Sequence, residues 1–256
     1  MVGYLEVALE AAEASGKVLM RYFNTGVGVM SKGGMNYVTE ADYKSQDTII
    51  KIIKRSFPQH NIFSEEAPYD DQGSAYTWFL DPLDATHNYM RNIPIFGVSI
   101  ALTQGNNILV GVSYFPTFKQ MYHAEKGKGA YNNNKRIHVS KFGIADKYAM
   151  LMELKSGSRN RAVKLFKALE SEKNRLRALG CASYETALLA QGSIDAFVPL
   201  GTNFYDVASG ILSIEEAGGK VTDIHGNRWT KETKDYIFSN GILHNRMLSF
   251  VRKARI

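Results

Sequence analysis

The stretch WFLDPLDATHN, residues 78–88, decides the fold and contains the first candidate site. Its apolar start predicts a buried strand, and Asp81 follows where that strand is expected to end. Asp84 comes three residues later, so two carboxylates converge at one strand end. If the chain turns helical at Ala85 and Thr86, their backbone N–H groups face an anion. The stretch therefore predicts a shared site for a metal and a phosphate.

Clustered carboxylates predict a hard cation at this strand end. Mg²⁺ prefers oxygen ligands and keeps several waters, whereas zinc would need His or Cys. The histidines show no zinc-ligand spacing; they are His60, His87, His123, His138, His225 and His244. A structural alternative stays open at this point, with Asp81 as a turn residue and Asp84 as a helix N-cap.

Further acidic residues strengthen the functional interpretation. Glu65 and Glu66 follow a second short strand, although adjacent acids are commonly just solvated. Asp206 lies in the first turn of a predicted helix, where a carboxylate suits the helix dipole. Asp42 can form a capping box with Thr39. Each residue alone admits a structural role, and their joint appearance favours a site.

The composition is that of a globular protein with a sizeable core. The chain has 256 residues, of which 45% are hydrophobic. The N-terminus lacks the apolar stretch of a signal peptide, and no apolar run reaches the roughly 20 residues of a membrane span. The single cysteine, Cys181, excludes an internal disulfide and fits a reducing compartment. We therefore expect a cytoplasmic protein with no membrane partner.

The net charge of +6 favours anionic partners without identifying them. Basic residues gather between positions 159 and 177, but Glu170 and Glu172 interrupt them and no aromatic series runs alongside. We interpret this stretch as an exposed helix face, so a nucleic-acid partner is not expected.

The first half of the chain predicts two helices and a sheet. Residues 4–23 place apolar side chains near helical spacing, and a glycine-bearing loop follows them. A second helix is expected to begin after Thr39 and to end before Pro58. From about 61 to 140, short β-rich runs separated by turn signals predict an antiparallel sheet.

After about residue 145, helical and extended segments alternate. Helices are predicted over 159–171, 183–191 and 203–217, and the extended segments are RLRAL, DAFVPL, KVTD and YIFS. Gly218 and Gly219 are expected to end the last helix. The pattern indicates an α+β or layered α/β architecture.

The chain resembles the inositol monophosphatase family, within the lithium-sensitive, magnesium-dependent phosphatase superfamily that also contains fructose-1,6-bisphosphatase. The resemblance spans nearly the whole chain. It rests on VTEAD (38–42), FSEE (63–66), WFLDPLDATHN (78–88) with PIFGVSIAL after it, EKGKGAYNN (125–133) and YDVASGILSIEEAGGKVTD (205–223). The resemblance implies an α+β fold built as a layered α/β/α/β/α sandwich. It also implies a homodimer of single-domain chains, with an N-terminal α+β lobe over about 1–140 and a C-terminal α/β lobe over about 141–256.

The resemblance also implies two to three Mg²⁺ ions per active site. The implied metal ligands are Glu66, Asp81, the carbonyl of Leu83, Asp84 and Asp206. Asp81 would bind both of the first two ions. Glu66 and the carbonyl of Leu83 would complete the ligands of the first ion, and Asp84 and Asp206 those of the second. A third, weaker ion would lie near Glu65 and Glu66.

The catalytic residues implied in the same way are Asp42, Thr86 and Glu65. Thr86 and Asp42 would orient and deprotonate a metal-bound water that attacks phosphorus in line. The implied substrate contacts are Asp84, Ala85, Thr86, Gly180, Cys181, Ala182 and Asp206. Lys32 would belong to a lid over the metals, and Cys181 has the alternative of being a small buried residue.

Two departures from the family pattern bear on specificity. Ala85 stands where most relatives have Gly, and its methyl group is tolerated only at negative φ. Pro199 stands where inositol-specific relatives carry a Glu that grips sugar hydroxyls, which weakens an inositol preference.

The predicted function is therefore that of a Mg²⁺-dependent phosphomonoesterase acting on inositol 1-phosphate or a related sugar or polyol phosphate. A fructose-1,6-bisphosphatase and an adenosine 3′,5′-bisphosphate phosphatase stay open, as does an RNA- or transcription-associated regulatory protein that retains the fold. The spacing D-x-x-D-x-T argues against an aspartyl nucleophile, and G-x-S-x-G is absent. The expected partner is a small phosphorylated metabolite.

Overall fold

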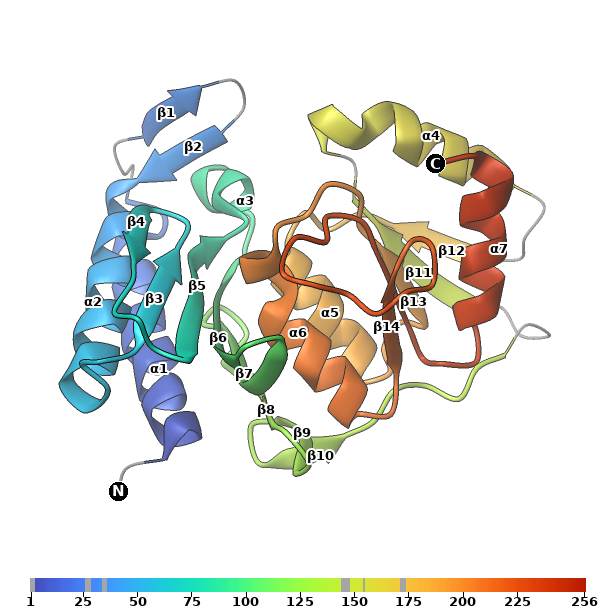
Figure 1. Ribbon diagram of the computed structural model, residues 1–256. Coiled ribbons are helices and arrows are strands. Elements are labelled where there is room, and N and C mark those ends of the chain that lie inside the picture. Colours follow the sequence, from blue (N-terminus) through green and yellow to red (C-terminus); the bar gives the residue numbers. More distant parts are fainter. Residues whose placement is uncertain (1–2, 26–28, 34–35, 144–147, 154, 171–173) are drawn as a thin grey trace.

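The computed structural model describes residues 3–25, 29–33, 36–143, 148–153, 155–170 and 174–256. Within these residues the fold has two mixed sheets, one of eight strands and one of five, with helices between and outside them (Figure 1). The helices are α1 (Tyr4–Tyr22), α2 (Glu40–Ser56), α3 (Thr86–Met90), α4 (Arg159–Ala168), α5 (Ala182–Ala190), α6 (Phe204–Glu216) and α7 (His244–Ala254), together with the 3₁₀ helix η1 (Ser156–Ser158).

The strands follow the order of the chain. They are β1 (Val29–Gly33), β2 (Asn36–Thr39), β3 (Asn61–Ser64), β4 (Ala67–Asp70), β5 (Tyr76–Asp84), β6 (Gly97–Gln104), β7 (Asn107–Phe115), β8 (Gln120–Glu125), β9 (Gly129–Asn132), β10 (Lys135–Ile137), β11 (Tyr148–Met152), β12 (Asn174–Arg177), β13 (Ala196–Val198), β14 (Lys220–Asp223) and β15 (Tyr236–Ser239). β1 and β2 pair in the segment predicted as a loop, and the side chain of Lys32 lies outside the described residues.

The eight-stranded sheet has the order β10-β9-β8-β7-β6-β5-β3-β4. Neighbouring strands within this sheet are antiparallel, except that β3 and β5 pair in parallel from Asn61↔Thr77 to Ser64↔Leu80. The prediction of a purely antiparallel sheet was wrong at this pair. The chain reverses into β4 and then returns, so β5 starts at the same end of the sheet as β3. As a result β3 and β5 end at one edge, which brings their acidic ends together.

Both faces of this sheet are buried, which explains the unbroken apolar run in β5. Trp78 and Leu80 pack in the cluster with α1 and α2, while Phe79 points to the cluster with α6. Alternate side chains of a strand lie on opposite faces, so a strand covered on both sides needs apolar residues throughout.

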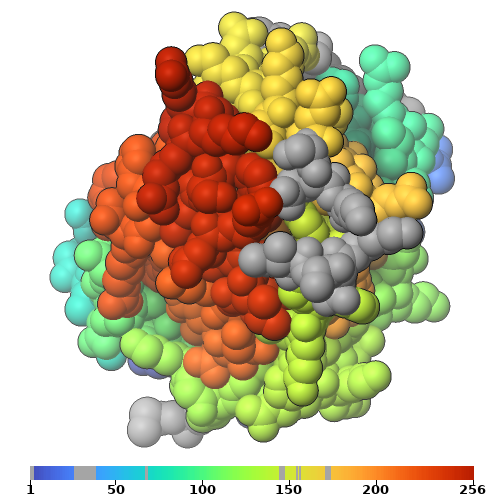
Figure 2. All heavy atoms as spheres, turned by 90° about the vertical axis from the view of Figure 1, so that its right-hand side faces the viewer, coloured from blue at the N-terminus to red at the C-terminus, as the bar shows by residue number. Residues whose placement is uncertain are grey.

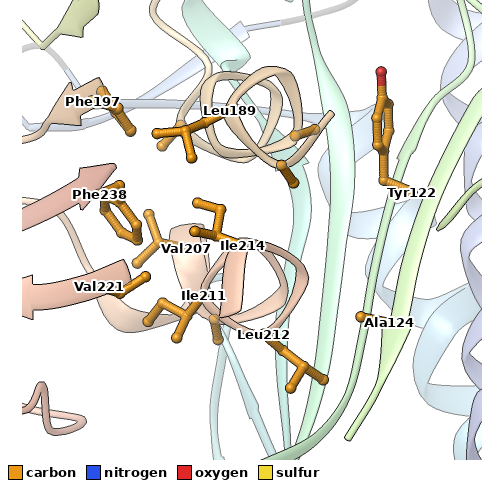
Figure 3. Packing of buried hydrophobic residues seen from close by; sticks show 14 of the residues in the cluster. Tyr122, Ala124, Leu189, Phe197, Val207, Ile211, Leu212, Ile214, Val221 and Phe238 are labelled. Atoms are coloured by element: carbon orange, nitrogen blue, oxygen red, sulfur yellow. The ribbon is translucent and has the colours of Figure 1, made fainter. Parts of the chain in front are cut away.

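The five-stranded sheet has the order β12-β11-β13-β15-β14, and α5 and α6 lie between the two sheets (Figure 1). Figure 3 shows this middle layer, where Leu189 and Ile211 face Phe197, Phe238 and Val221 of the five-stranded sheet. On the outer face, α7 lies beside α4 (Figure 2). The order of layers is therefore α/β/α/β/α, as predicted.

Close contact between α6 and the eight-stranded sheet fixes the helix that carries Asp206. A Cβ added to Gly111 of β7 would lie 2.7 Å from the carbonyl oxygen of Ser209. The Ser209 hydroxyl lies 2.8 Å from the hydroxyls of both Ser99 and Ser113. A glycine and three hydroxyls therefore set the distance between helix and sheet.

The basic stretch from 159 to 177 is not one helix face. α4 ends at Ala168, residues 171–173 lie outside the described residues, and Arg175 and Arg177 are exposed on the edge strand β12. The short β12 pairs in parallel with β11, so its basic residues belong to a sheet edge. Among the described helices, none combines the length and apolar character of a membrane span.

Candidate active site

The turn after β5 differs from the predicted one in two ways. β5 continues through Asp84, with an irregular register between the pairs Asp81↔Ser99 and Asp84↔Gly97, so Asp81 lies within the strand and not after it. Ala85 then adopts a left-handed conformation with φ 71° and ψ 45°, and α3 begins at Thr86. The requirement for negative φ at Ala85 is therefore not met, and the chain accepts a strained non-glycine residue there.

Asp42 forms the predicted capping box and also lies beside Thr86. It stands at the third position of α2, where Oδ2 accepts hydrogen bonds from the backbone N–H of Thr39 at 2.8 Å and from the Thr39 hydroxyl at 2.5 Å. Its other oxygen, Oδ1, lies 3.3 Å from Oγ1 of Thr86. Burial raises the pKa of Asp42 to about 6. The capping box thus holds a carboxyl group beside the start of α3.

Asp84 joins β5 to the beginning of α5. Its Oδ2 accepts hydrogen bonds from the backbone N–H of Ser183 at 2.7 Å and from the Ser183 hydroxyl at 2.5 Å. The Cys181 thiol is also buried and donates to the same oxygen at 3.2 Å. A carboxylate at the N-terminus of a helix is stabilised by the free N–H groups there. Cys181 is therefore a small buried residue that also contacts the site.

Gly180, Cys181 and Ala182, the predicted substrate contacts, lie at the start of α5 near Asp84. The side-chain amide of Asn88, in the middle of α3, donates to the carbonyl of Leu179 at 2.9 Å and holds the segment before Gly180 in place. Gly180 has a φ of 69°, which a glycine adopts without strain. The segment before α5 is thus hydrogen-bonded to α3.

Asp206 reaches the site from the first turn of α6. Its Oδ2 accepts a hydrogen bond from the backbone N–H of Asn203 at 3.1 Å, which closes a capping box. Burial raises the pKa of Asp206 to about 7; the nearby ammonium of Lys155 opposes this shift and the charge of Asp84 adds to it. The carboxyl group is buried next to charges of both signs.

Asp81 lies at the centre of the acidic residues. Its pKa is raised well above the ordinary value, first by complete burial and then by the nearby negative charges of Glu65, Asp84, Asp206 and Asp42. Its Oδ1 accepts a hydrogen bond from the backbone N–H of Leu83 at 3.1 Å. The Leu83 carbonyl lies 3.1 Å from Oγ1 of Thr86. Five carboxyl groups from four segments, two of them on β5, therefore lie within electrostatic range of one another.

Glu65 and Glu66 lie just beyond the end of β3. The backbone N–H of Glu65 donates to the carbonyl of Leu80 at 3.3 Å, which continues the parallel pairing of β3 with β5. The pairing places Glu65 beside Asp81, because Ser64 is the partner of Leu80. Register therefore brings the two acidic segments side by side.

The oxygen donors fit a hard cation in chemistry but do not converge on one point. No three of the described His, Cys, Asp and Glu side chains form a group that could hold a metal ion. The carboxyl group of Asp84 turns toward Ser183, that of Asp42 toward Thr39, and that of Asp206 toward Lys155 and Asn203. These carboxyl groups nevertheless supply the oxygen atoms that Mg²⁺ prefers as ligands.

Three residues at the site were not predicted from sequence. Lys155 and Glu153 follow β11, and Thr202 follows β13. The Thr202 hydroxyl donates to Oε2 of Glu153 at 2.6 Å, and the Lys155 ammonium lies 3.5 Å from Oδ2 of Asp206. Only Thr202 had a sequence signal, because it follows the predicted extended segment DAFVPL, whereas no strand was predicted before Glu153 and Lys155.

An aromatic cavity of about 460 Å³ lies next to the acidic residues. Its walls include Phe63, two residues before Glu65, and Tyr205, directly before Asp206, and the two rings stack with centroids 5.9 Å apart. Tyr205 thus provides an aromatic wall beside Asp206. A larger groove of about 830 Å³ is lined by residues between 118 and 138 and by Gln191, and none of the predicted site residues lines it.

The layered fold, with acidic residues gathered where β5 and α6 meet, is that of a class of α/β phosphatases. The chain belongs to the inositol monophosphatase family, whose family model matches residues 3–255. The family consists of Mg²⁺-dependent phosphomonoesterases.

Similar proteins carry more than one name. A fructose-1,6-bisphosphatase/inositol-1-monophosphatase of Aquifex aeolicus is 34% identical, with 98% of this chain and 96% of that protein covered. The Nus factor SuhB of Pseudomonas aeruginosa is 29% identical, with 97% and 95% covered. The structure of the Thermotoga maritima inositol monophosphatase has a TM-score of 0.91 and 30% identity, with 98% and 97% covered. Family and fold are therefore shown, and these names differ in the function they state.

Proposed function

We propose that the chain is a Mg²⁺-dependent phosphomonoesterase acting on inositol 1-phosphate or a related sugar or polyol phosphate. One observation carries this proposal. The buried carboxyl groups of Asp81 and Asp84 on β5 lie near that of Asp206 on α6, and the charges of Asp84 and Asp206 raise the pKa of Asp81. Gathering negative charge in a buried place is unfavourable unless a cation compensates it.

In this proposal the metal ligands are the predicted ones: Glu66, Asp81, the Leu83 carbonyl, Asp84 and Asp206. Two to three Mg²⁺ ions would bind, with Glu65 beside the weakest. Bound Mg²⁺ lowers the pKa of a coordinated water and neutralises charge on the attacking and leaving oxygens. The donor set supports the proposal because it consists of oxygen atoms alone.

The protein's own groups would handle the proton and the phosphate. The Thr86 hydroxyl lies between the Asp42 carboxyl group and the Leu83 carbonyl, so it can pass a proton from water toward Asp42. The backbone N–H groups of Ala85 and Thr86 would bind phosphate oxygens at the start of α3. Gly180, Cys181 and Ala182 would line the alcohol part of the ester, on the opposite lobe.

The substrate ranking follows from Pro199. This residue follows β13 and is buried, and its carbonyl accepts a hydrogen bond from the backbone N–H of Tyr236 at 3.1 Å. Its ring has no acceptor atom for sugar hydroxyls. We propose activity on several esters, with inositol and sugar phosphates ahead of adenosine 3′,5′-bisphosphate. The homodimer, lithium sensitivity and cytoplasmic location belong to the same proposal, and the free, buried Cys181 is compatible with a reducing compartment.

The testing experiment is phosphate release in Mg²⁺ from inositol 1-phosphate, fructose 1,6-bisphosphate and adenosine 3′,5′-bisphosphate. Asp84→Asn should lower kcat/KM at least about 100-fold, because it removes a charge from the proposed metal site. The exposed Asp47→Asn on α2 is the matched control and should leave kcat/KM unchanged. Unchanged release in Asp84→Asn would sink the metal mechanism, and cleavage of the nucleotide alone would reverse the ranking.

A regulatory role is the second candidate, because a similar protein is named a Nus factor and β12 exposes two basic residues. Reversing charge in Arg175→Glu and Arg177→Glu should then abolish binding of a single-stranded RNA probe while phosphate release persists. Equal RNA binding by the variants and the wild type would remove this candidate.

A further inference from the structure

Lys155 lies at the carboxyl ends of two parallel strands, a usual place for ligand binding in α/β structures. β11 and β13 pair in parallel, with Met152 opposite Val198. Lys155 is three residues beyond Met152, and Thr202 is four residues beyond Val198, so both follow strand ends on one side of the sheet. The topology therefore places an ammonium group beside the proposed metal site.

The Lys155 ammonium is held by three long contacts. Its Nζ lies 3.3 Å from Oγ1 of Thr202, 3.4 Å from Oε2 of Glu153 and 3.5 Å from Oδ2 of Asp206. These distances exceed the usual 2.7–2.9 Å of a charge-assisted hydrogen bond, so the contacts orient the group without using its full capacity. A closer acceptor on a ligand would compete well for its N–H groups.

Exposure shows which of these groups a ligand can reach. The side chain of Lys155 is 43% exposed, whereas that of Glu153 is 4% and that of Asp206 is 10% exposed. The group presented toward solvent is therefore a cation, with both carboxylates behind it.

The register adds a contrast at the neighbouring strand end. Pro199 follows Val198 as Glu153 follows Met152, and Pro199 is buried and has no side-chain acceptor. The accessible charged group at these two strand ends is thus positive. A neutral polyol gains little from it, whereas a carboxylate or second phosphate on the substrate gains a charge-assisted hydrogen bond.

We propose that Lys155 selects phosphate esters whose alcohol part carries a second anionic group. The inference rests on the proposed phosphomonoesterase function and, among its proposed substrates, favours a sugar phosphate with a second anionic group over inositol 1-phosphate. In the proposed active enzyme the charge of Asp206 would be directed to the metal ions that it would help to hold, so it would not cancel the effect of Lys155. The alternative is that Lys155 only neutralises Glu153 and Asp206, in which case its removal would affect all esters alike.

A matched pair of substrates separates these possibilities. In 3-phosphoglycerate a carboxylate replaces the terminal hydroxymethyl group of glycerol 3-phosphate, so the esters differ in one anionic group. The variants are Lys155→Met, which keeps the apolar stem, and Lys155→Arg, which keeps the charge. Lys164→Met on the exposed face of α4 is the control for loss of one positive charge.

We expect the wild type to prefer 3-phosphoglycerate. Lys155→Met should lower kcat/KM for this ester about tenfold, mainly through KM, and change the value for glycerol 3-phosphate less than about twofold. Lys155→Arg should keep most of the preference, and Lys164→Met all of it. Equal losses on both esters, or no loss on either, would overturn the inference.

Binding distinguishes failure of this inference from failure of the proposed function. If the wild type releases phosphate from no ester, the proposed function fails, and calorimetry with 3-phosphoglycerate in Mg²⁺ then tests Lys155 alone. Tighter binding by the wild type than by Lys155→Met would support the inference. Equal binding by the two proteins would refute it, whatever the activity.

Discussion

The hydroxyl of Thr86 lies 3.3 Å from Oδ1 of Asp42, a residue 44 positions earlier in the chain. The contact joins the start of α3 to the capping box of α2, where Thr39 holds the other carboxyl oxygen of Asp42. Thr86 and Asp42, which each have a local structural role, thus lie close enough together for the proposed proton transfer.

Thr86→Val should lower kcat about 100-fold, because valine has the same shape but no hydroxyl to relay a proton. Thr86→Ser keeps the hydroxyl and should retain most of the activity. If the two residues act as one unit, Asp42→Asn combined with Thr86→Val should lose no more than the worse single variant. Kinetics of the wild type, the two single variants and the double variant in Mg²⁺ measure the coupling between the two residues. Fully additive losses would show that the residues act separately.

The metal-free protein should lose stability as the pH rises from about 4 to 7. The pKa values of Asp42 and Asp206 are raised from 3.8 to about 6 and about 7, so the folded state holds these protons more tightly than the unfolded state. Their stabilising effect is complete below the unfolded pKa and disappears as the pH passes the folded one. For Asp42 alone the change corresponds to about 3 kcal/mol, as an order of magnitude.

Urea unfolding with EDTA at several pH values measures this dependence, and Asp42→Asn should flatten it. Mg²⁺ should restore stability more at pH 7.5 than at pH 5, because protons compete with metal for the carboxylates. A metal-free wild type whose stability rises over this range, or an Asp42→Asn variant with the same slope, would contradict the expected sign.

Ala85→Gly should maintain or raise the free energy of unfolding, by up to about 1 kcal/mol, because glycine adopts a φ of 71° without the strain that alanine incurs. Ala14→Gly within α1 is the matched control and should lose about 0.5–1 kcal/mol. Urea unfolding checks both variants. Equal losses at the two positions would mean that the left-handed conformation at Ala85 carries no strain.

Gly111→Ala should destabilise the protein by about 1–3 kcal/mol, because the new methyl would press on the backbone of Ser209 at 2.7 Å. Since α6 carries Asp206, the variant should also reduce phosphate release. Gly157→Ala, where nothing lies within 4 Å of an added Cβ, is the control and should have little effect on stability. Denaturant midpoints of the two variants compare them directly, and equal midpoints would show that α6 can shift freely.

Local signals predicted much of the structure. The capping box of Thr39 and Asp42 started α2 as expected, and the apolar run before Asp81 formed a strand buried on both faces. Such features depend on neighbours in the chain, whose spacing is visible in the sequence. The parallel pairing of β3 with β5 was not visible, because it depends on where β4 returns the chain.

By itself the sequence determined the family motifs and the acidic residue types, hence a site with oxygen donors. Only the tertiary structure showed that β5 continues through Asp84, that Ala85 is left-handed and that Lys155 lies beside Asp206. The physical reason is that strand irregularities and contacts such as that of Lys155 with Asp206 depend on the packing of segments that are distant in the sequence. Strand register and helix placement decide which side chains share a site, and no local pattern encodes them.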